Sequence, residues 1–445
     1  MWSRFWIVLV LSVLSILGTR YMATSSPYAY ENWSYGGVGV AAMLGVLLLS
    51  VVLAALLPAR LHKPSSLALW FVAVVAVIPT VVSSLTYVRL DVEIRAYASG
   101  LALLGYIVLF LVVRHGPMLR LPKGPIETNR AMVRWSAILG VVFLVFCFAS
   151  IGFNTSGLSF VDVYVRRSEY ALNVTGLTVY VVQWAILVVA PLVVIVGCQF
   201  RRGSLVVLGL AIGLVVFSVS GQKYAAVTLV SSFAFWLITR RDNAANRQEP
   251  RIPLVGLFFV LLLGIPWLVL YFSGNDSLFY LITRRVLVSP GRLSVEYAYY
   301  FWEGNSPGLL APIHSLLNGS GDSLSVTIGD FIDPTVSMNA NSSFLSYGLV
   351  TGGLFGVLLY SLLVGMLFIL ADGIAATRPV GVMVPFLGIT MGVLAETFLH
   401  TSLLTHGVVF ALLLGWLIPV ATADGGMEDE ESAQGSAFSE LPSTG

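Results

Sequence analysis

The chain has very little charge. Only 10% of its 445 residues are Asp, Glu, Lys or Arg, whereas 57% are hydrophobic. A soluble globular domain usually carries about 25% charged residues. The composition therefore excludes an ordinary soluble protein and predicts one that is embedded in a membrane. The net charge of +2 gives no reason to expect a nucleic-acid partner.

Cysteine and metal-ligand patterns are also scarce. Cys147 and Cys198 are the only cysteines, and we expect them near opposite membrane faces, too far apart for a disulfide. No His, Cys or carboxylate group has metal-ligand spacing, and no glycine-rich loop suits a soluble nucleotide. We therefore expect neither a metal nor a cofactor.

Long apolar runs define the fold class. A run of about 17 to 25 apolar residues can cross a hydrocarbon core. The sequence predicts an all-α, polytopic transmembrane helix bundle of about 12 spans, within a membrane domain of residues 1–421. The spans are expected at 3–19, 37–57, 66–87, 97–113, 133–151, 176–198, 204–219, 224–239, 252–272, 347–371, 379–399 and 403–421. We interpret the first as an uncleaved anchor, with a cleaved signal peptide as the alternative.

The distribution of cations predicts the orientation. With the N-terminus inside, fifteen of the 24 Lys and Arg residues fall on the cytoplasmic side, as the positive-inside rule requires. Both termini are then cytoplasmic, and the protein is a multi-pass protein of the cytoplasmic (inner) membrane. Residues 422–445 are acidic and polar, which predicts a disordered cytoplasmic tail. Of the outer cations, Arg89 and Arg95 bracket Asp91 and Glu93, a loop expected to neutralise itself.

One outer loop, 273–346, is long enough to be functional. It is rich in aromatic residues, and we expect short interfacial helices at 278–288 and 291–302, with Pro290 in a first helical turn. After it, Gly348, Gly352 and Gly356 recur every four residues, which favours close helix packing.

Two arginine pairs, Arg166–Arg167 and Arg284–Arg285, lie on the predicted outer side, where cations are usually depleted. Guanidinium groups grip phosphate through two hydrogen bonds and remain charged in any environment. If the pairs converge, they would bind the pyrophosphate of a lipid-linked donor and stabilise its leaving group. The alternative for the first pair is a solvated salt bridge to Asp162 or Glu169.

Other residues complete the predicted site. Lys223, in a glycine turn, either binds phosphate or snorkels to the headgroups, and Arg292 either binds substrate or pairs with Glu296 four residues on. The predicted substrate-binding set is Arg166, Arg167, Lys223, Arg284, Arg285, Arg292 and Tyr297. The predicted catalytic set is Glu396, His400 and Asp330, with His314 and Asp333 as further candidates for the base. Glu396 lies inside a span, so the alternative to a catalytic role is a structural hydrogen bond.

Three segments resemble one known family. Arg284–Phe301 (RRVLVSPGRLSVEYAYYF) is similar to the start of the large outer loop in bacterial O-antigen polymerases, also called oligosaccharide repeat-unit polymerases. Asn339–Gly356 (NANSSFLSYGLVTGGLFG) resembles the loop exit and the following span. Ser220–Lys223 resembles the family's Gly-Ser-Lys type of turn, with Gln222 at a usually small position. The likeness covers the overall span plan and is specific over about 180–356.

The resemblance implies an enzyme that polymerises polyprenyl-pyrophosphate-linked repeat units at the outer face, without a metal, into O-antigen, capsule or exopolysaccharide. It carries Arg284 and Arg285 over as substrate contacts, and Arg166 and Arg167 less directly. The implied partners are lipid-linked oligosaccharides and membrane lipids, with a flippase and a chain-length regulator as further candidates. The alternatives are an O-antigen ligase-type transferase and a transporter of lipid-linked glycans or polysaccharide.

Overall fold

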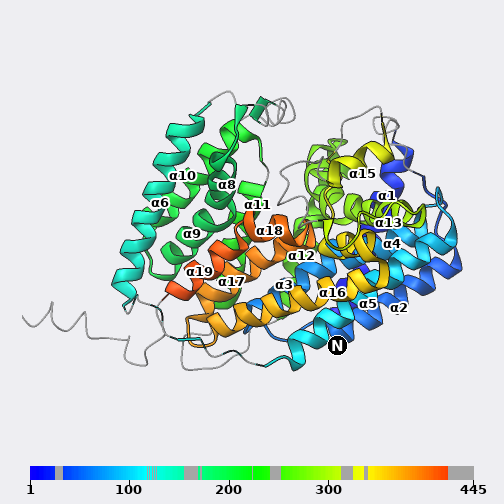
Figure 1. The fold of residues 1–445 in the computed structure, drawn as a ribbon, viewed down its shortest axis with the longest axis horizontal. Coiled ribbons are helices and arrows are strands. Elements are labelled where there is room, and N and C mark those ends of the chain that lie inside the picture. Colours follow the sequence, from blue (N-terminus) through cyan, green and yellow to red (C-terminus); the bar gives the residue numbers. More distant parts are fainter. Residues whose placement is uncertain are drawn as a thin grey trace, which may run out of the picture.

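A computed structural model describes residues 1–25, 34–117, 128–154, 169–170, 173–222, 224–240, 252–311, 324–334 and 339–418, together with the single positions 119, 121, 122, 124 and 126. All regular structure in this part of the chain is helical (Figure 1). The fold class is therefore all-α, as predicted. The acidic tail lies outside the described residues.

Nine of the described helices are long and apolar enough to cross a membrane, so the chain is a multi-pass helical membrane protein. They cover Trp2–Thr24, Pro64–Thr86, Val92–His115, Asn129–Ile151, Leu177–Gln199, Gly203–Ser220, Pro253–Ser273, Phe344–Ala375 and Leu399–Leu417. Three shorter apolar helices, Val40–Leu56, Ala225–Thr239 and Val380–Ala395, stand where the other predicted spans were expected. The helix at each predicted span is thus confirmed, and nine of the described helices are candidate membrane spans.

The individual helices follow one another along the whole chain. Their bounds are α1 (Trp2–Thr24), α2 (Val40–Leu56), α3 (Pro64–Phe71), η2 (Val72–Val77), α4 (Ile78–Thr86), α5 (Val92–His115), α6 (Asn129–Ile151), α8 (Leu177–Trp184), η4 (Ala185–Val189), α9 (Ala190–Gln199), α10 (Gly203–Ser220), α11 (Tyr224–Thr239), α12 (Ile252–Ser273), η6 (Phe279–Val288), α13 (Ser289–Trp302), α15 (Leu324–Ile332), α16 (Phe344–Ala375), α17 (Val380–Gly392), η7 (Val393–Ala395), α18 (Leu399–Leu404) and α19 (Val408–Leu417).

Three stretches, η2, η4 and η6, are wider π-helices. Each ends two residues before a proline, namely Pro79, Pro191 and Pro290. Proline lacks an amide hydrogen, and its ring clashes with the carbonyl four residues earlier. A wider preceding turn moves that carbonyl away while the helix continues. Proline therefore widens these helices instead of ending them, and Pro290 begins α13 as predicted.

Helix α16 is broken near its start. Gly352 and Gly353 leave helical geometry, and Gly353 has a φ of 55°, which a side chain would disfavour. The chain turns back so that a Cβ atom at Gly356 would lie only 2.0 Å from the Gly348 carbonyl oxygen. The predicted glycine stripe therefore does permit close packing, but between the two halves of its own helix. The second half is still long enough to cross a membrane.

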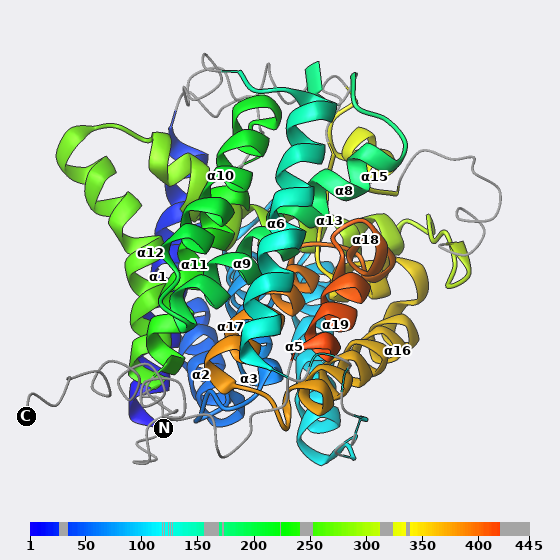
Figure 2. The same cartoon turned by 90° about the vertical axis from the view of Figure 1, so that its left-hand side faces the viewer.

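Polar contacts join the helix ends at one side of the bundle. Asp372, near the end of α16, accepts hydrogen bonds from the Ser65 amide (3.0 Å) and hydroxyl (2.7 Å) at the start of α3. The Arg378 guanidinium donates to the carbonyls of Trp416 (2.8 Å) and Ile418 (2.7 Å) at the end of α19. In Figure 2, the start of α1 lies at the lower end of the bundle. A cation at these carbonyls also complements the helix dipole.

We expect Gly356→Ala to lower the thermal midpoint of the purified protein, because the new methyl group would overlap the Gly348 carbonyl. The cost of such overpacking is about 1–3 kcal/mol. Gly100→Ala in α5 is the control, since nothing lies within 4 Å of its Cβ position. A thermal midpoint for Gly356→Ala equal to that of Gly100→Ala would contradict the close approach.

Candidate functional site

Helices η6 and α13 form one continuous run that carries Arg284, Arg285 and Arg292. The short helices predicted at 278–288 and 291–302 are present, and most of the first ten residues of α13 are buried against other helices. Gly291 permits this packing, because a Cβ atom there would lie 2.1 Å from the Pro79 carbonyl oxygen of α4. The helix therefore docks on α4 with backbone against backbone.

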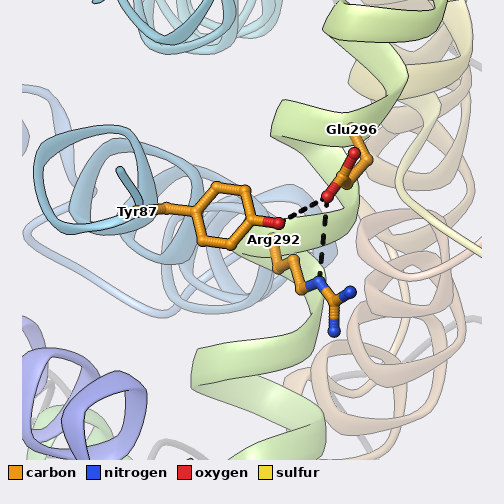
Figure 3. Close-up of polar contacts among 3 residues, drawn as sticks. All are labelled: Tyr87, Arg292 and Glu296. Atoms are coloured by element: carbon orange, nitrogen blue, oxygen red, sulfur yellow. Dashed lines mark hydrogen bonds and ion pairs between the residues drawn. The ribbon is translucent and has the colours of Figure 1, made fainter. Parts of the chain in front are cut away.

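A buried polar group ties α13 to the loop after α4 (Figure 3). The Tyr87 hydroxyl donates a 2.7 Å hydrogen bond to Oε1 of Glu296, and the Arg292 Nε lies 3.9 Å from the same oxygen. Tyr87 is fully buried, and Glu296 and Arg292 are 3% and 8% exposed. The pairing of Arg292 with Glu296, one of the two predicted alternatives, is therefore present. It does not test whether Arg292 also binds substrate.

Burial and the neighbouring Glu296 carboxylate raise the pKa of Tyr87 to about 12. The phenol therefore keeps its proton and remains a donor at physiological pH. Burial acts to lower the pKa of Arg89, but Tyr87 and Glu296 act to raise it, and the net direction is upward. One carboxylate thus interacts with a phenol and two guanidinium groups, which offsets the cost of burying its charge.

The opposite side of α13 is fixed by neutral hydrogen bonds. The Tyr297 hydroxyl donates to the Ala340 carbonyl at 2.8 Å, and the Ser294 and Ser346 hydroxyls lie 2.8 Å apart. These bonds hold the start of α16 against α13. Tyr297 is fully buried, so in this structure its visible role is to anchor the helix.

Arg284 and Arg285 differ in their surroundings. The Arg284 guanidinium lies over the Tyr280 ring at 4.2 Å, and its Nε and Nη1 atoms are buried. Arg285 is exposed. Their helix is held in place from both sides, because Thr283 donates to the Leu263 carbonyl (2.9 Å) and Ser15 donates to the Leu287 carbonyl (2.6 Å). A cation–π contact of this kind orients the guanidinium plane.

The predicted catalytic residues Glu396 and His400 lie where the last two apolar helices, Val380–Ala395 and Leu399–Leu417, meet. Glu396 follows the short turn η7, and His400 lies in α18; both are partly exposed. The His400 ring is 5.3 Å from Tyr347 and 5.9 Å from Phe398. Its Nδ1 atom is buried and has no hydrogen-bond partner among the described residues. Phe398 also contacts Tyr297 at 6.2 Å, so the structure brings His400 and α13 into one neighbourhood.

The remaining predicted site residues lie on or after α15 or outside the described part of the chain. Asp330 is exposed on α15, and Asp333 follows that helix. Four predicted residues lie outside the described part of the chain: Arg166, Arg167, Lys223 and His314. Whether the two arginine pairs meet is therefore not tested.

Sequence reasoning missed Tyr87 and misjudged its loop. Arg89 interacts with Tyr87 and Glu296, and Arg95 donates from Nη1 to the Ser84 carbonyl at 3.0 Å, so it caps α4. These cations therefore do not merely balance their acidic neighbours. Tyr87 and Glu296 are separated by 209 positions, and no local pattern signals such a contact.

Among the residues that the structure describes, no group of three His, Cys, Asp or Glu side chains could hold a metal ion. Comparison with known families, curated proteins and solved structures found no match. The fold defines the class, a multi-pass helical membrane protein.

We expect Tyr87→Phe to destabilise the protein by about 1–3 kcal/mol, because a buried carboxylate loses a hydrogen bond. The phenol has a raised pKa in the folded state, so its contribution is complete below pH 10 and falls as the pH rises from 10 to about 12. Thermal unfolding across this range measures the difference between wild type and variant. A difference that stays constant to pH 12 would contradict the assignment.

Proposed function

We propose that this protein is a membrane glycosyltransferase that polymerises polyprenyl-pyrophosphate-linked oligosaccharide repeat units at the outer face of the cytoplasmic membrane. An acceptor sugar hydroxyl would attack the anomeric carbon of the donor glycan. The bond from that carbon to the carrier pyrophosphate would break, and the hydroxyl proton would pass to a base. The released polyprenyl pyrophosphate needs cations to stabilise its charge.

One observation carries the proposal: the helical run η6–α13 packs against apolar helices and carries Arg284 and the buried Arg292, with the exposed Arg285 beside Arg284. Arginine within apolar surroundings is costly, so it is usually retained for a function. The exposed Arg285 can reach a ligand directly, while the ring of Tyr280 orients Arg284 beside it. The sequence resemblance of this same segment to repeat-unit polymerases supports the same assignment.

Glu396 and His400 are the leading candidates for the base. Both lie at the junction of α17 and α18, and Tyr347 and Phe398 connect His400 with the buried end of α13. A base must reach the acceptor hydroxyl within hydrogen-bond distance.

We expect Arg284→Ala to shorten the glycan chains by at least about tenfold in length, because one charge-assisted phosphate contact is lost. The assay is the length distribution of surface glycan in a strain that expresses the variant at the wild-type level. Arg284→Lys should only partly restore long chains, since lysine lacks the planar fork.

Arg20→Ala is the matched control, because Arg20 is an exposed arginine at the end of α1 and belongs to no part of the proposed site. Its chains should keep the wild-type length. Long chains from Arg284→Ala at a normal protein level would sink the polymerase assignment.

The broken helix α16 favours a second candidate, a transporter of lipid-linked glycans. Transporters often bind substrate where helices are discontinuous, and α16 has such a break at Gly352–Gly353.

The two candidates predict different products in a strain that lacks the protein. A missing polymerase should leave single repeat units attached to the surface lipid, whereas a missing transporter should leave lipid-linked units on the cytoplasmic leaflet. A ligase-type transferase instead predicts loss of all attached glycan. Separate extraction of the two pools, with mass spectrometry of each, decides among the three outcomes.

A further inference from the structure

We infer that Glu296 and Tyr87 are positioning residues, which orient Arg292 so that its guanidinium binds the pyrophosphate of the lipid-linked substrate. The inference rests on the proposed function and adds two residues that the sequence did not assign to the site. It begins from the geometry of a single oxygen atom, Oε1 of Glu296.

Oε1 takes the Tyr87 hydroxyl hydrogen bond at 2.7 Å and faces the Nε atom of Arg292 at 3.9 Å. The carboxylate therefore approaches the side of the guanidinium group and not its tip. Figure 3 shows the two terminal nitrogens of Arg292 directed away from Glu296. These terminal nitrogens form the fork that suits a phosphate group.

The charges of this group support an anionic ligand. One carboxylate, Glu296, stands beside two guanidinium groups, those of Arg292 and Arg89. The net charge of these three side chains is positive. Arg292 is 8% exposed, and Arg89 is exposed. A positive group in apolar surroundings interacts with an anion more strongly than it would in water.

Tyr87 holds the carboxylate by a hydrogen bond, and the carboxylate attracts the Arg292 guanidinium from 3.9 Å. Tyr87 is fully buried and comes from a different part of the fold than α13, so its ring holds Oε1 at a set position. Two further contacts, Ser294 with Ser346 and Tyr297 with Ala340, prevent α13 from turning about its axis. Side chains locked in this way provide the preorganisation that a binding site requires.

Arg292 is also separate from the arginine pair Arg284–Arg285. It lies eight residues beyond Arg284 on the same helical run, which corresponds to about 12 Å along a helix. Its contribution to binding can therefore be measured apart from that of Arg284 and Arg285.

The test uses the full-length protein in lipid nanodiscs, with sugar-free polyprenyl pyrophosphate as the probe. We expect Glu296→Gln and Arg292→Ala each to weaken its Kd about tenfold. The double variant should bind no more weakly than Arg292→Ala alone, within about twofold, because Glu296 acts through Arg292. Glu303→Gln, at an exposed carboxylate just after α13, is the control and should keep the wild-type Kd.

Tyr87→Phe is a second variant that tests whether Glu296 positions Arg292. We expect it to weaken the Kd about threefold, since the carboxylate keeps its charge but loses its anchor. Polyprenyl monophosphate and inorganic pyrophosphate, tested as competitors, distinguish recognition of the lipid from recognition of the anion.

A merely structural role for Glu296 would lower the yield or the thermal midpoint of its variants and leave the Kd of the folded fraction unchanged. That result overturns the inference, as do losses from Glu296→Gln and Arg292→Ala that add in the double variant. If the wild type fails to bind polyprenyl pyrophosphate, the proposed function fails together with the inference. Wild-type binding with additive losses overturns the inference alone.

Discussion

A carboxylate buried among apolar helices must have its charge compensated within the protein, and the position of α13 follows from this constraint. Arg292 lies on the same helix as Glu296, but Glu296 reaches the Tyr87 phenol only when α13 lies against α4. Gly291 permits that approach, and hydrogen bonds to the start of α16 fix the other side. The run η6–α13 is therefore part of the bundle and presents its arginines at defined positions.

The break in α16 follows from a related constraint. Non-helical backbone at membrane depth is tolerated only where protein or a polar cavity surrounds it. The break at Gly352–Gly353 meets this condition, because a Cβ atom at Gly353 would lie 2.9 Å from the Tyr97 hydroxyl and 3.0 Å from the Phe301 ring. The connection between η7 and α18 contains Phe398, whose ring lies 4.4 Å from the ring of Tyr347. Aromatic side chains of α5, α13 and α16 thus cover the irregular segments.

The sequence predicted the helices well and their contacts poorly. Apolar runs depend on local composition, so every predicted span has a helix at its place, although the glycines of α16 turned one span into a broken helix. The presence of a proline does not predict whether the helix before it widens into a π-helix. Pro79 follows a π-helix, whereas Pro266 lies inside α12 as an ordinary helical residue. The bond between Tyr87 and Glu296 depends on how distant helices pack, which no local pattern encodes.

The central claim is that the run η6–α13 forms the binding surface for the carrier pyrophosphate. The most direct measurement is to photo-crosslink a polyprenyl pyrophosphate analogue, reactive beside its phosphates, to the protein in membranes and to map the labelled peptide. The account predicts label within residues 279–302, reduced by an excess of unmodified polyprenyl pyrophosphate. Label confined to the opposite end of the bundle, around Asp372 and Arg378, would contradict it.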